Sequence, residues 1–372
     1  MLRITRELVM TLTAVALAAC GAAPTPEPEA EVPPQPPEHY FPPLDEGGTW
    51  ERTSAEEAGL DAAAIDAAMT FAREAGSSGV VVLHDGRIVA EAHWEVGEPT
   101  ARYGRMATGQ TGGGQSVEDV ASVQKSVVSF LVGVAEGKGL LELDAPVSRY
   151  LGEGWSAAPP DKEQAVTVEH LLAMTSGLAI DGSYEVPPGE RWQYNTRVYS
   201  RMLGVLEAST GLSTDEYTRQ WLTEPTGMSD SSWTPRPWVA NEDANAVGFS
   251  TTARDLARFG LMLQRAGRWE GDDLLGNVGY IGRSTSPSQT LNEAYGYLWW
   301  LNGQASGLRA NGQEFAGGFI PTAPDDLYAA LGALGRMLYI VPSRKLVVTR
   351  LGDAPGADFN PEFWRLLLGG AS

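Results

Sequence analysis

Cysteine and histidine are both scarce in this sequence. Cys20 is the only cysteine among 372 residues, so no intrachain disulfide bond can form and no cysteine cluster can bind a metal. The four histidines lie far apart, and none shows the His-x-x-x-His spacing that places two ligands on one helix face. The sequence therefore predicts neither a metal site nor a cofactor, although scattered ligands could still converge in the fold.

Basic residues are few compared with acidic ones. The chain has 27 Lys and Arg against 47 Asp and Glu, which gives a formal net charge of −20. A protein with this charge repels phosphate backbones and anionic lipid headgroups, which argues against nucleic acid as a partner. Hydrophobic residues make up 43% of the chain and charged residues 20%, a composition typical of globular proteins. The length fits two or three domains, or one enzyme domain with an insertion.

The apolar stretch at the N-terminus is short. It covers residues 8–19 and follows Arg3 and Arg6, and it is too short to cross about 30 Å of hydrocarbon. We therefore predict a signal peptide over 1–19. The stretch ends in the letters LAACG around Cys20, which resemble the bacterial lipobox, whose cysteine becomes the lipidated first residue of the mature protein. An ordinary signal peptide with a coincidental cysteine is the alternative.

A lipid on Cys20 would anchor the protein in the bacterial cell envelope, facing the periplasm or the exterior. Residues 20–48 are rich in Pro and Glu, a composition that cannot bury a core and that favours extended conformers. We interpret this segment as a tether that precedes a globular domain over 49–372. The sequence leaves open which membrane holds the anchor.

Strand patterns occur at both ends of the globular part, and helical patterns lie between them. A helix is predicted over 60–75 and a hairpin over 79–90, and a second hairpin over 337–351 precedes a closing helix over 359–368. The periodic segments between them are helical: 122–136, 166–173, 198–209, 213–222 and 252–265. The sequence thus predicts an α/β fold of the α+β kind, in which helices flank an antiparallel sheet. A mainly helical second lobe is expected over roughly 130–295.

Ser122 and Lys125 are the strongest candidates for chemistry. They open a predicted helix with one apolar stripe, and side chains three positions apart on a helix are neighbours. A serine is a weak nucleophile until a base takes its proton, and burial can keep a lysine neutral enough to do so. The Ser-x-x-Lys spacing alone is weak evidence because it also arises by chance.

The sequence around this pair resembles the serine hydrolases related to class C β-lactamases and penicillin-binding proteins, in which Ser-x-x-Lys carries the nucleophile. Seven blocks carry the resemblance, in the family's order: 56–72, 80–92, 121–151, 166–178, 187–195, 250–269 and 337–348. It implies a β-lactamase/transpeptidase-like fold, with a cleft between the two lobes at the start of the Ser122 helix. Ser122 would be the nucleophile and Lys125 its activator.

Two further motifs of the family have imperfect matches here. The Tyr-x-Asn motif places its tyrosine at Tyr194, which would exchange protons with the nucleophile and the leaving group. Its asparagine directly follows as Asn195 instead of two residues on, and Asn195 is the candidate for substrate binding. The Lys- or His-x-Gly motif matches residues 330–332, which lack the basic residue.

The glycine of that third motif is Gly332. It would allow a close approach to the backbone, and the amide of the next residue, Ala333, would form an oxyanion hole with the amide of Ser122. The alternative, that this strand has small residues for packing reasons, fits the sequence equally well.

Other residues are less promising. His170 is expected to have a packing or capping role, and the aromatic run 295–300 is expected to be core more than pocket. Asp255 reads as a solvated surface charge. The chain has no Gly-x-Ser-x-Gly motif, which excludes the nucleophile elbow of α/β-hydrolases.

The first functional hypothesis is a serine hydrolase that cleaves an ester, an amide or a peptide-like bond through an acyl-enzyme. A binding or sensor lipoprotein of the same fold, non-catalytic or slow to deacylate, is the alternative. The third motif lacks its cation, and no motif places the nearest candidates by sequence, Arg197 and Arg336. Neutral esters or amides are therefore expected to be better substrates than anionic β-lactams. Substrate identity and oligomeric state stay open.

Overall fold

The computed structural model describes residues 39–44, 49–239 and 245–370. The predicted signal peptide, Cys20 and the tether up to residue 38 lie outside the described residues. Among the residues that are described, no helix is both long and apolar enough to cross a membrane.

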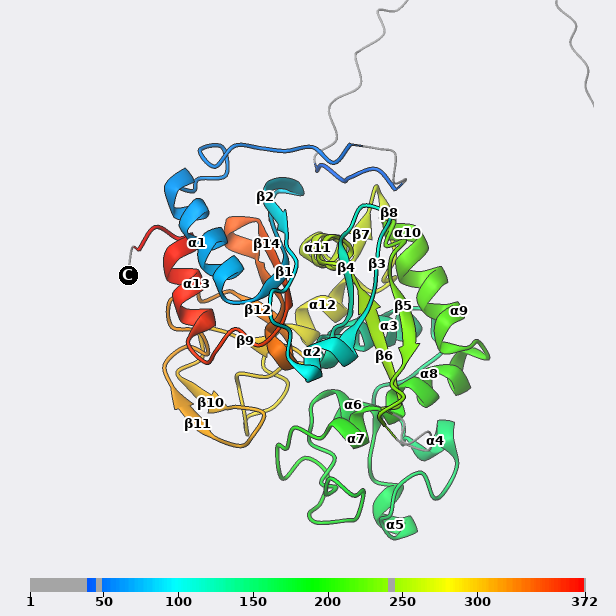
Figure 1. Ribbon diagram of the computed structural model, residues 1–372. Helices are drawn as coiled ribbons and strands as arrows, with labels where there is room; N and C mark the ends of the chain where they lie inside the picture. The colour runs from blue at the N-terminus through cyan, green and yellow to red at the C-terminus, as the bar shows by residue number, and fades with distance from the viewer. Residues whose placement is uncertain (1–38, 45–48, 240–244, 371–372) are drawn as a thin grey trace, which may run out of the picture. The chain divides into compact units, whose positions relative to one another are not determined.

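The central element is a six-stranded antiparallel sheet built from both ends of the domain (Figure 1). Its order is β2 (Arg87–His93), β1 (Ser77–His84), β14 (Leu346–Gly352), β13 (Arg336–Val341), β12 (Tyr328–Gly332) and β9 (Trp300–Leu301). The first predicted hairpin is β1–β2 and the second is β13–β14. Because β1 pairs with β14, the two ends of the domain are joined in one sheet.

Helices cover both faces of this sheet, as the sequence predicts. On one face, α1 (Ala62–Glu74) packs against α13 (Phe359–Leu367), and the side chain of Asp61 caps α1 by accepting from the amide of Ala64 at 2.8 Å (Figure 1). On the other face, α11 (Ala253–Gln264) lies across β14, β1 and β13. Gly260 permits this close packing, because a Cβ atom there would lie 2.5 Å from the side chain of Val347.

The second lobe is mainly helical and surrounds α3 (Gln124–Gly137), a helix whose first twelve residues are all buried. Its other helices are α4 (Ser148–Leu151), α5 (Pro160–Glu163), α6 (Val168–Leu172), α7 (Thr196–Tyr199), α8 (Arg201–Thr210), α9 (Thr214–Thr218), α10 (Glu224–Thr226) and α12 (Val278–Ser284). Polar side chains that such a helix buries need hydrogen-bond partners, and Ser126 of α3, for example, donates its hydroxyl proton to the carbonyl oxygen of Leu298 at 2.8 Å.

A second antiparallel sheet, which the sequence did not predict, lies between the lobes. It has the order β3 (Ala107–Gln110), β4 (Ser116–Asp119), β6 (Val247–Thr251) and β5 (Ser232–Pro235). Two further two-stranded pieces are β7 (Arg268–Trp269) with β8 (Asp272–Asp273), and β10 (Ser306–Leu308) with β11 (Glu314–Ala316). The strands of the second sheet have four or five residues and many polar side chains, so they lack the apolar runs by which strands are found.

The domain begins earlier than the expected tether boundary at residue 48. The ring of Phe41 packs on that of Trp269 with 5.1 Å between centroids, and Arg258 donates to the carbonyl oxygen of Pro43 at 2.8 Å. The compact unit accordingly starts at His39. The reason is local, since two aromatic side chains near the end of the Pro-rich segment can bury apolar area that its prolines and glutamates cannot.

Candidate active site

A strained turn places Ser122 at the start of α3. The chain leaves β4, and Ala121 takes a φ of 51°, a left-handed conformation that costs a non-glycine residue about 1–2 kcal/mol. The turn is held by the carboxylate of Asp119, which accepts from the amide of Ala121 at 2.8 Å. Ser122 then lies in a short 3₁₀ turn that continues into α3.

Lys125 lies one turn further along and faces the serine, as the helical spacing predicts. Its Nζ donates to the Oγ of Ser122 at 3.0 Å, and the residue is 2% exposed. Burial lowers the pKa of Lys125, and the positive charge of Arg236 acts in the same direction, so that this pKa is about 7. At neutral pH a large fraction of this amine is therefore unprotonated and able to accept the proton of Ser122.

The hydroxyl group of Tyr194 is also a hydrogen-bond partner of Ser122. Burial raises the pKa of Tyr194 to about 12, and its hydrogen bond with Ser122 acts in the opposite direction. The Nζ of Lys125 lies 4.8 Å from the centroid of the Tyr194 ring and 4.7 Å from that of Tyr199. Ser122, Lys125 and Tyr194, which are predicted from separate parts of the sequence, are thus brought together.

An aromatic cluster packs behind Tyr194. The ring of Trp300 stacks on that of Tyr194 with 5.7 Å between centroids, and Tyr295 contacts both rings. Tyr295 is 1% exposed and Trp300 5%, which confirms that this aromatic run is core. The cluster fixes the orientation of the Tyr194 ring.

The end of β12 approaches the Ser122 turn very closely. A Cβ atom on Gly332 would lie 2.3 Å from the carbonyl oxygen of Val120 and 3.3 Å from the amide nitrogen of Ser122. The next residue, Ala333, lines the cleft with Ser122. Ala330, at the position of the missing basic residue, is 1% exposed and does not line the cleft.

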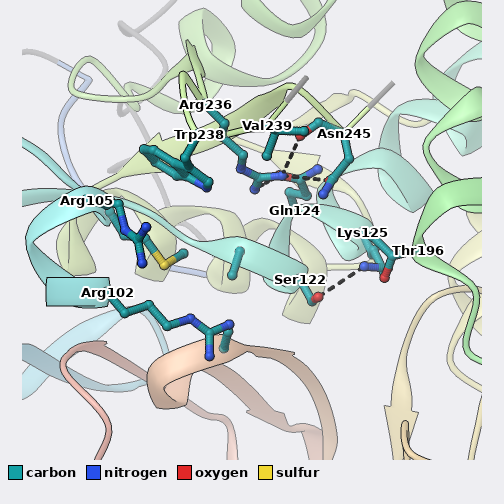
Figure 2. Close-up of a pocket in the computed structure, with 13 residues that line it drawn as sticks. Arg102, Arg105, Ser122, Gln124, Lys125, Thr196, Arg236, Trp238, Val239 and Asn245 are labelled. Carbon is teal, nitrogen blue, oxygen red and sulfur yellow. Dashed lines mark hydrogen bonds between the residues drawn. The ribbon is translucent and has the colours of Figure 1, made fainter. Parts of the chain in front are cut away.

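The cleft over Ser122 has a volume of about 390 Å³. Figure 2 shows Lys125 and Thr196 on one side of Ser122 and two arginines, Arg102 and Arg105, on the other. Among the described residues, no group of three or more His, Cys, Asp or Glu side chains is placed to hold a metal ion.

The family model described as Beta-lactamase matches residues 62–370. The chain belongs to the beta-lactamase family. It is 24% identical over 313 residues to an uncharacterised protein of Alkalihalophilus pseudofirmus, covering 76% of this chain and 86% of that one. It is also 30% identical over 146 residues to esterase EstB of Burkholderia gladioli, covering 30% of this chain and 37% of the esterase.

A solved structure of a penicillin-binding protein of Bacillus halodurans has the same fold. Its TM-score is 0.56 at 16% identity, and the match covers 79% of this chain and 97% of that one. This likeness, with the two sheets and the helical lobe, confirms the β-lactamase/transpeptidase-like fold that the resemblance implied.

The structure does not place Asn195 of the second family motif where the sequence-based expectation of substrate binding requires it. Asn195 is 2% exposed, its Nδ2 donates to the carbonyl oxygens of Leu178 and Ala179 at 3.1 and 3.0 Å, and its Oδ1 accepts from the amide of Val198 at 3.1 Å. Its side chain therefore caps α7 and ties down a loop instead of facing substrate. Thr196, which occupies the third position of the beta-lactamase-family Tyr-x-Asn motif, lines the cleft in its place. Keeping the motif's register would have found it.

Arg236 is a further residue of the site, and no sequence pattern indicates it. Its Nε and Nη2 donate to the two carboxylate oxygens of Asp119 at 2.7 and 2.9 Å, and Nη2 also donates to Oε1 of Gln124 at 2.8 Å (Figure 2 draws the bond to Gln124). The residue is 7% exposed. It links the turn before Ser122 to the first residue of α3, and no local pattern signals a pair 117 positions apart.

Neither of the two arginines that the sequence suggested as cations for an anionic substrate lines the cleft, whereas two other arginines do. Arg336 is fully buried and pairs with Glu118 at 2.9 Å, and Arg197 lines a separate hollow. Arg102 and Arg105 line the cleft instead. The cations that could meet an anionic substrate thus come from a helix outside the family motifs, whereas neither of the two candidates nearest by sequence lines the cleft.

Two predictions about single residues had opposite outcomes. His170 is a capping residue, as predicted, since its Nδ1 accepts from the amide of Thr167 at 3.1 Å. Asp255 is not a solvated surface charge. It is 4% exposed, and it accepts from the hydroxyl group of Ser231 at 2.8 Å and the amide of Asp230 at 2.9 Å. The first turn of α11 faces the domain interior, which the charge of Asp255 conceals in the sequence.

Proposed function

We propose that this protein is a serine hydrolase that cleaves an ester or amide bond through an acyl-enzyme on Ser122. The observation that carries the proposal is the contact of 3.0 Å between Nζ of Lys125 and Oγ of Ser122, at a lysine whose pKa is about 7. A general base works best when its pKa lies near the operating pH, and this one does.

The reaction starts when neutral Lys125 accepts the hydroxyl proton of Ser122. Oγ then forms a bond to the substrate's carbonyl carbon, and the carbonyl oxygen becomes an oxyanion. The bond to the leaving atom breaks as that atom receives a proton from Tyr194, which takes one from protonated Lys125. Water attacks the ester so formed, with Lys125 again as base, and releases the acid and free Ser122.

Tyr194 is suited to relay protons and unsuited to be the primary base. With a pKa of about 12 its hydroxyl group stays protonated at neutral pH, so it can donate at once but cannot deprotonate Ser122. Its hydrogen bond with Ser122 keeps the hydroxyl group next to the position of the leaving atom.

The oxyanion hole is assigned to the amides of Ser122 and Ala333. The close approach of Gly332 to the Ser122 turn supports this assignment, because two backbone amides can converge on one oxygen only where the two chains nearly touch. The amides are fixed before substrate arrives and need no reorganisation during the reaction.

Esterase EstB shares 30% identity over part of the chain, which favours an ester among the possible substrates. The finer likeness to class C β-lactamases and penicillin-binding proteins rests on the seven sequence blocks and belongs to this proposal. The alternative of a sensor that deacylates slowly uses the same first step.

The test is intact-mass measurement after exposure to a serine-directed fluorophosphonate. Wild type should gain the mass of one adduct on the peptide with Ser122, and Ser122→Ala should gain none. An adduct on another serine would overturn the assignment. Sustained turnover of a 4-nitrophenyl ester identifies an enzyme, whereas a single burst followed by arrest identifies the sensor.

We further propose that the mature protein is a lipoprotein anchored through Cys20 in the bacterial cell envelope. The support is the lipobox-like sequence and the Pro/Glu-rich segment that follows it. Cys20→Ala should abolish incorporation of labelled palmitate and block removal of residues 1–19. Recovery of wild type from membranes with an unmodified N-terminus at another residue would contradict the proposal.

A further inference from the structure

The helix α2 (Ala101–Met106) forms one wall of the cleft over Ser122 and presents two exposed arginines there, Arg102 and Arg105. Within the ranges that the structure describes, neither side chain has an ion-pair or hydrogen-bond partner. By contrast, Arg254 outside the cleft pairs with Glu91. Two guanidinium groups in one cleft without a partner among the described residues are conspicuous in a chain with 47 acidic residues.

The rest of the fold holds α2 in place. The amide and hydroxyl groups of Thr100, its N-cap, donate to the carboxylate of Asp353 at 2.7 and 3.0 Å. Tyr103, which is 7% exposed, donates its hydroxyl proton to the buried carboxylate of Glu118 at 2.9 Å. These bonds join residues that are 253 and 15 positions apart in the sequence. The backbone that carries Arg102 and Arg105 therefore has a fixed position at the cleft.

The two arginines lie on the opposite side of Ser122 from Lys125 (Figure 2). In the proposed function the leaving atom must face Tyr194 and Lys125, since it receives its proton from them. The acyl part of the substrate must therefore lie on the other side of Ser122, next to α2. Trp238, which is 41% exposed, lines the same cleft and offers an apolar surface for methylene groups.

We propose that Arg102 and Arg105 determine substrate specificity by binding an anionic group on the acyl part of the substrate. The substrate class is then a half-ester or half-amide of a short dicarboxylic acid, with its free carboxylate on the two guanidinium groups and its methylene groups near Trp238. Guanidinium groups bind carboxylates through charge-assisted, often bidentate hydrogen bonds. The inference rests on the proposed function and adds the substrate class to it.

The experiment compares two esters with the same leaving group and the same acyl length. Mono-4-nitrophenyl glutarate has a free carboxylate at the end of its acyl chain, and 4-nitrophenyl pentanoate has a methyl group there. The double variant Arg102→Gln/Arg105→Gln should lower kcat/KM for the glutarate about tenfold or more and change that for the pentanoate less than about twofold. Arg197→Gln, an exposed arginine outside the cleft, is the matched control and should change neither.

Two further measurements guard against a misfolded variant. Arg102→Lys/Arg105→Lys keeps both charges and should retain most of the preference for the glutarate. Raising the salt concentration from about 20 to 500 mM should lower the wild-type rate with the glutarate and leave that with the pentanoate nearly unchanged, because exposed charges are screened.

The outcomes separate the two proposals. If turnover of both esters depends on Ser122 but the double Gln variant loses both equally, or loses neither, the inference about Arg102 and Arg105 is wrong and the hydrolase proposal stands. If Ser122→Ala hydrolyses both esters as fast as wild type, the hydrolase proposal fails and the inference fails with it.

Discussion

Gly332 approaches Val120 so closely that a Cβ atom on the glycine would lie 2.3 Å from the carbonyl oxygen of Val120. Real Cβ atoms do not approach a backbone oxygen to this distance, so any larger residue must push β12 away from the Ser122 turn. The contact therefore connects the packing of the sheet directly to the geometry of the proposed oxyanion hole.

Gly332→Ala should consequently damage activity more than stability. We expect kcat/KM for a 4-nitrophenyl ester to fall about 100-fold or more, the scale for losing an oxyanion-hole donor. The free energy of unfolding should fall by about 1–3 kcal/mol, as for other overpacked sites. Gly282→Ala is the control, since a Cβ atom there meets nothing within 4 Å. Near-normal activity of Gly332→Ala would remove Ala333 from the oxyanion hole.

The pH dependence of acylation should report Lys125. Only the neutral amine accepts the serine proton, so kcat/KM should rise about tenfold per pH unit below pH 7 and level off above it, following the pKa of about 7. Lys125→Ala should lower kcat/KM about 100-fold and flatten the profile between pH 5.5 and 9, measured with a 4-nitrophenyl ester. A wild-type profile that is flat over this range would show that Lys125 is not the base.

Arg236 influences the pH at which this profile has its midpoint. Its positive charge lowers the pKa of Lys125, and its removal also leaves the buried carboxylate of Asp119 without its charged partner. Both effects favour protonated Lys125, so Arg236→Gln should move the midpoint of the kcat/KM profile about one pH unit or more upward. The unpaired Asp119 should cost about 3–5 kcal/mol of stability, which Asp119→Asn should partly restore.

Arg258→Gln distinguishes this electrostatic effect from general damage. Arg258 is also buried, at 8% exposed, and it donates to the carbonyl oxygens of Thr226 and Pro43. Its removal should lower stability without moving the pH midpoint. An equal shift in both variants would contradict a specific action of Arg236 on Lys125.

Local patterns explain how much of the fold was predictable. The strands β1, β13 and β14 are apolar runs with turn residues between them, and α1 and α3 have clear helical stripes. The strands β3 and β4 read ATGQ and SVED, and nothing in such letters marks a strand. They become strands because β4 can pair with β6, more than a hundred positions away, and such pairing leaves no local signal.

The residues of the site also fall into two groups, those that local spacing predicts and those that only tertiary contacts place. Ser122 and Lys125 are one helical turn apart, so their contact follows from spacing alone. Residue type indicates Asn195, but the fold places the residue at the third position of the motif, Thr196, at the cleft. The pairing of Arg236 with Asp119 and the placement of Arg102 and Arg105 depend on tertiary contacts between distant segments.

Asp255 is a buried carboxylate whose contribution to the stability of the protein should depend on pH. Burial raises its pKa to about 7 and outweighs the hydrogen bond from Ser231, which lowers it. Because the folded-state pKa lies above the usual value near 4, the protonated form is favoured in the folded protein. The stabilisation is fully present below about pH 4 and is lost as the pH rises through about 7.

Asp255→Asn keeps the size of the side chain and an oxygen that accepts from Ser231 and Asp230, but it does not ionise. Between pH 5 and pH 8 the free energy of unfolding of wild type should therefore fall relative to this variant, by about 2–4 kcal/mol in all. Urea denaturation at a series of pH values measures the difference. Asp66→Asn changes an exposed aspartate on α1 and should give a curve parallel to wild type. If the wild-type and Asp255→Asn curves are also parallel, Asp255 stays ionised in the folded protein, and the desolvation of its carboxylate must be offset by Arg258, the nearby cation that lowers its pKa.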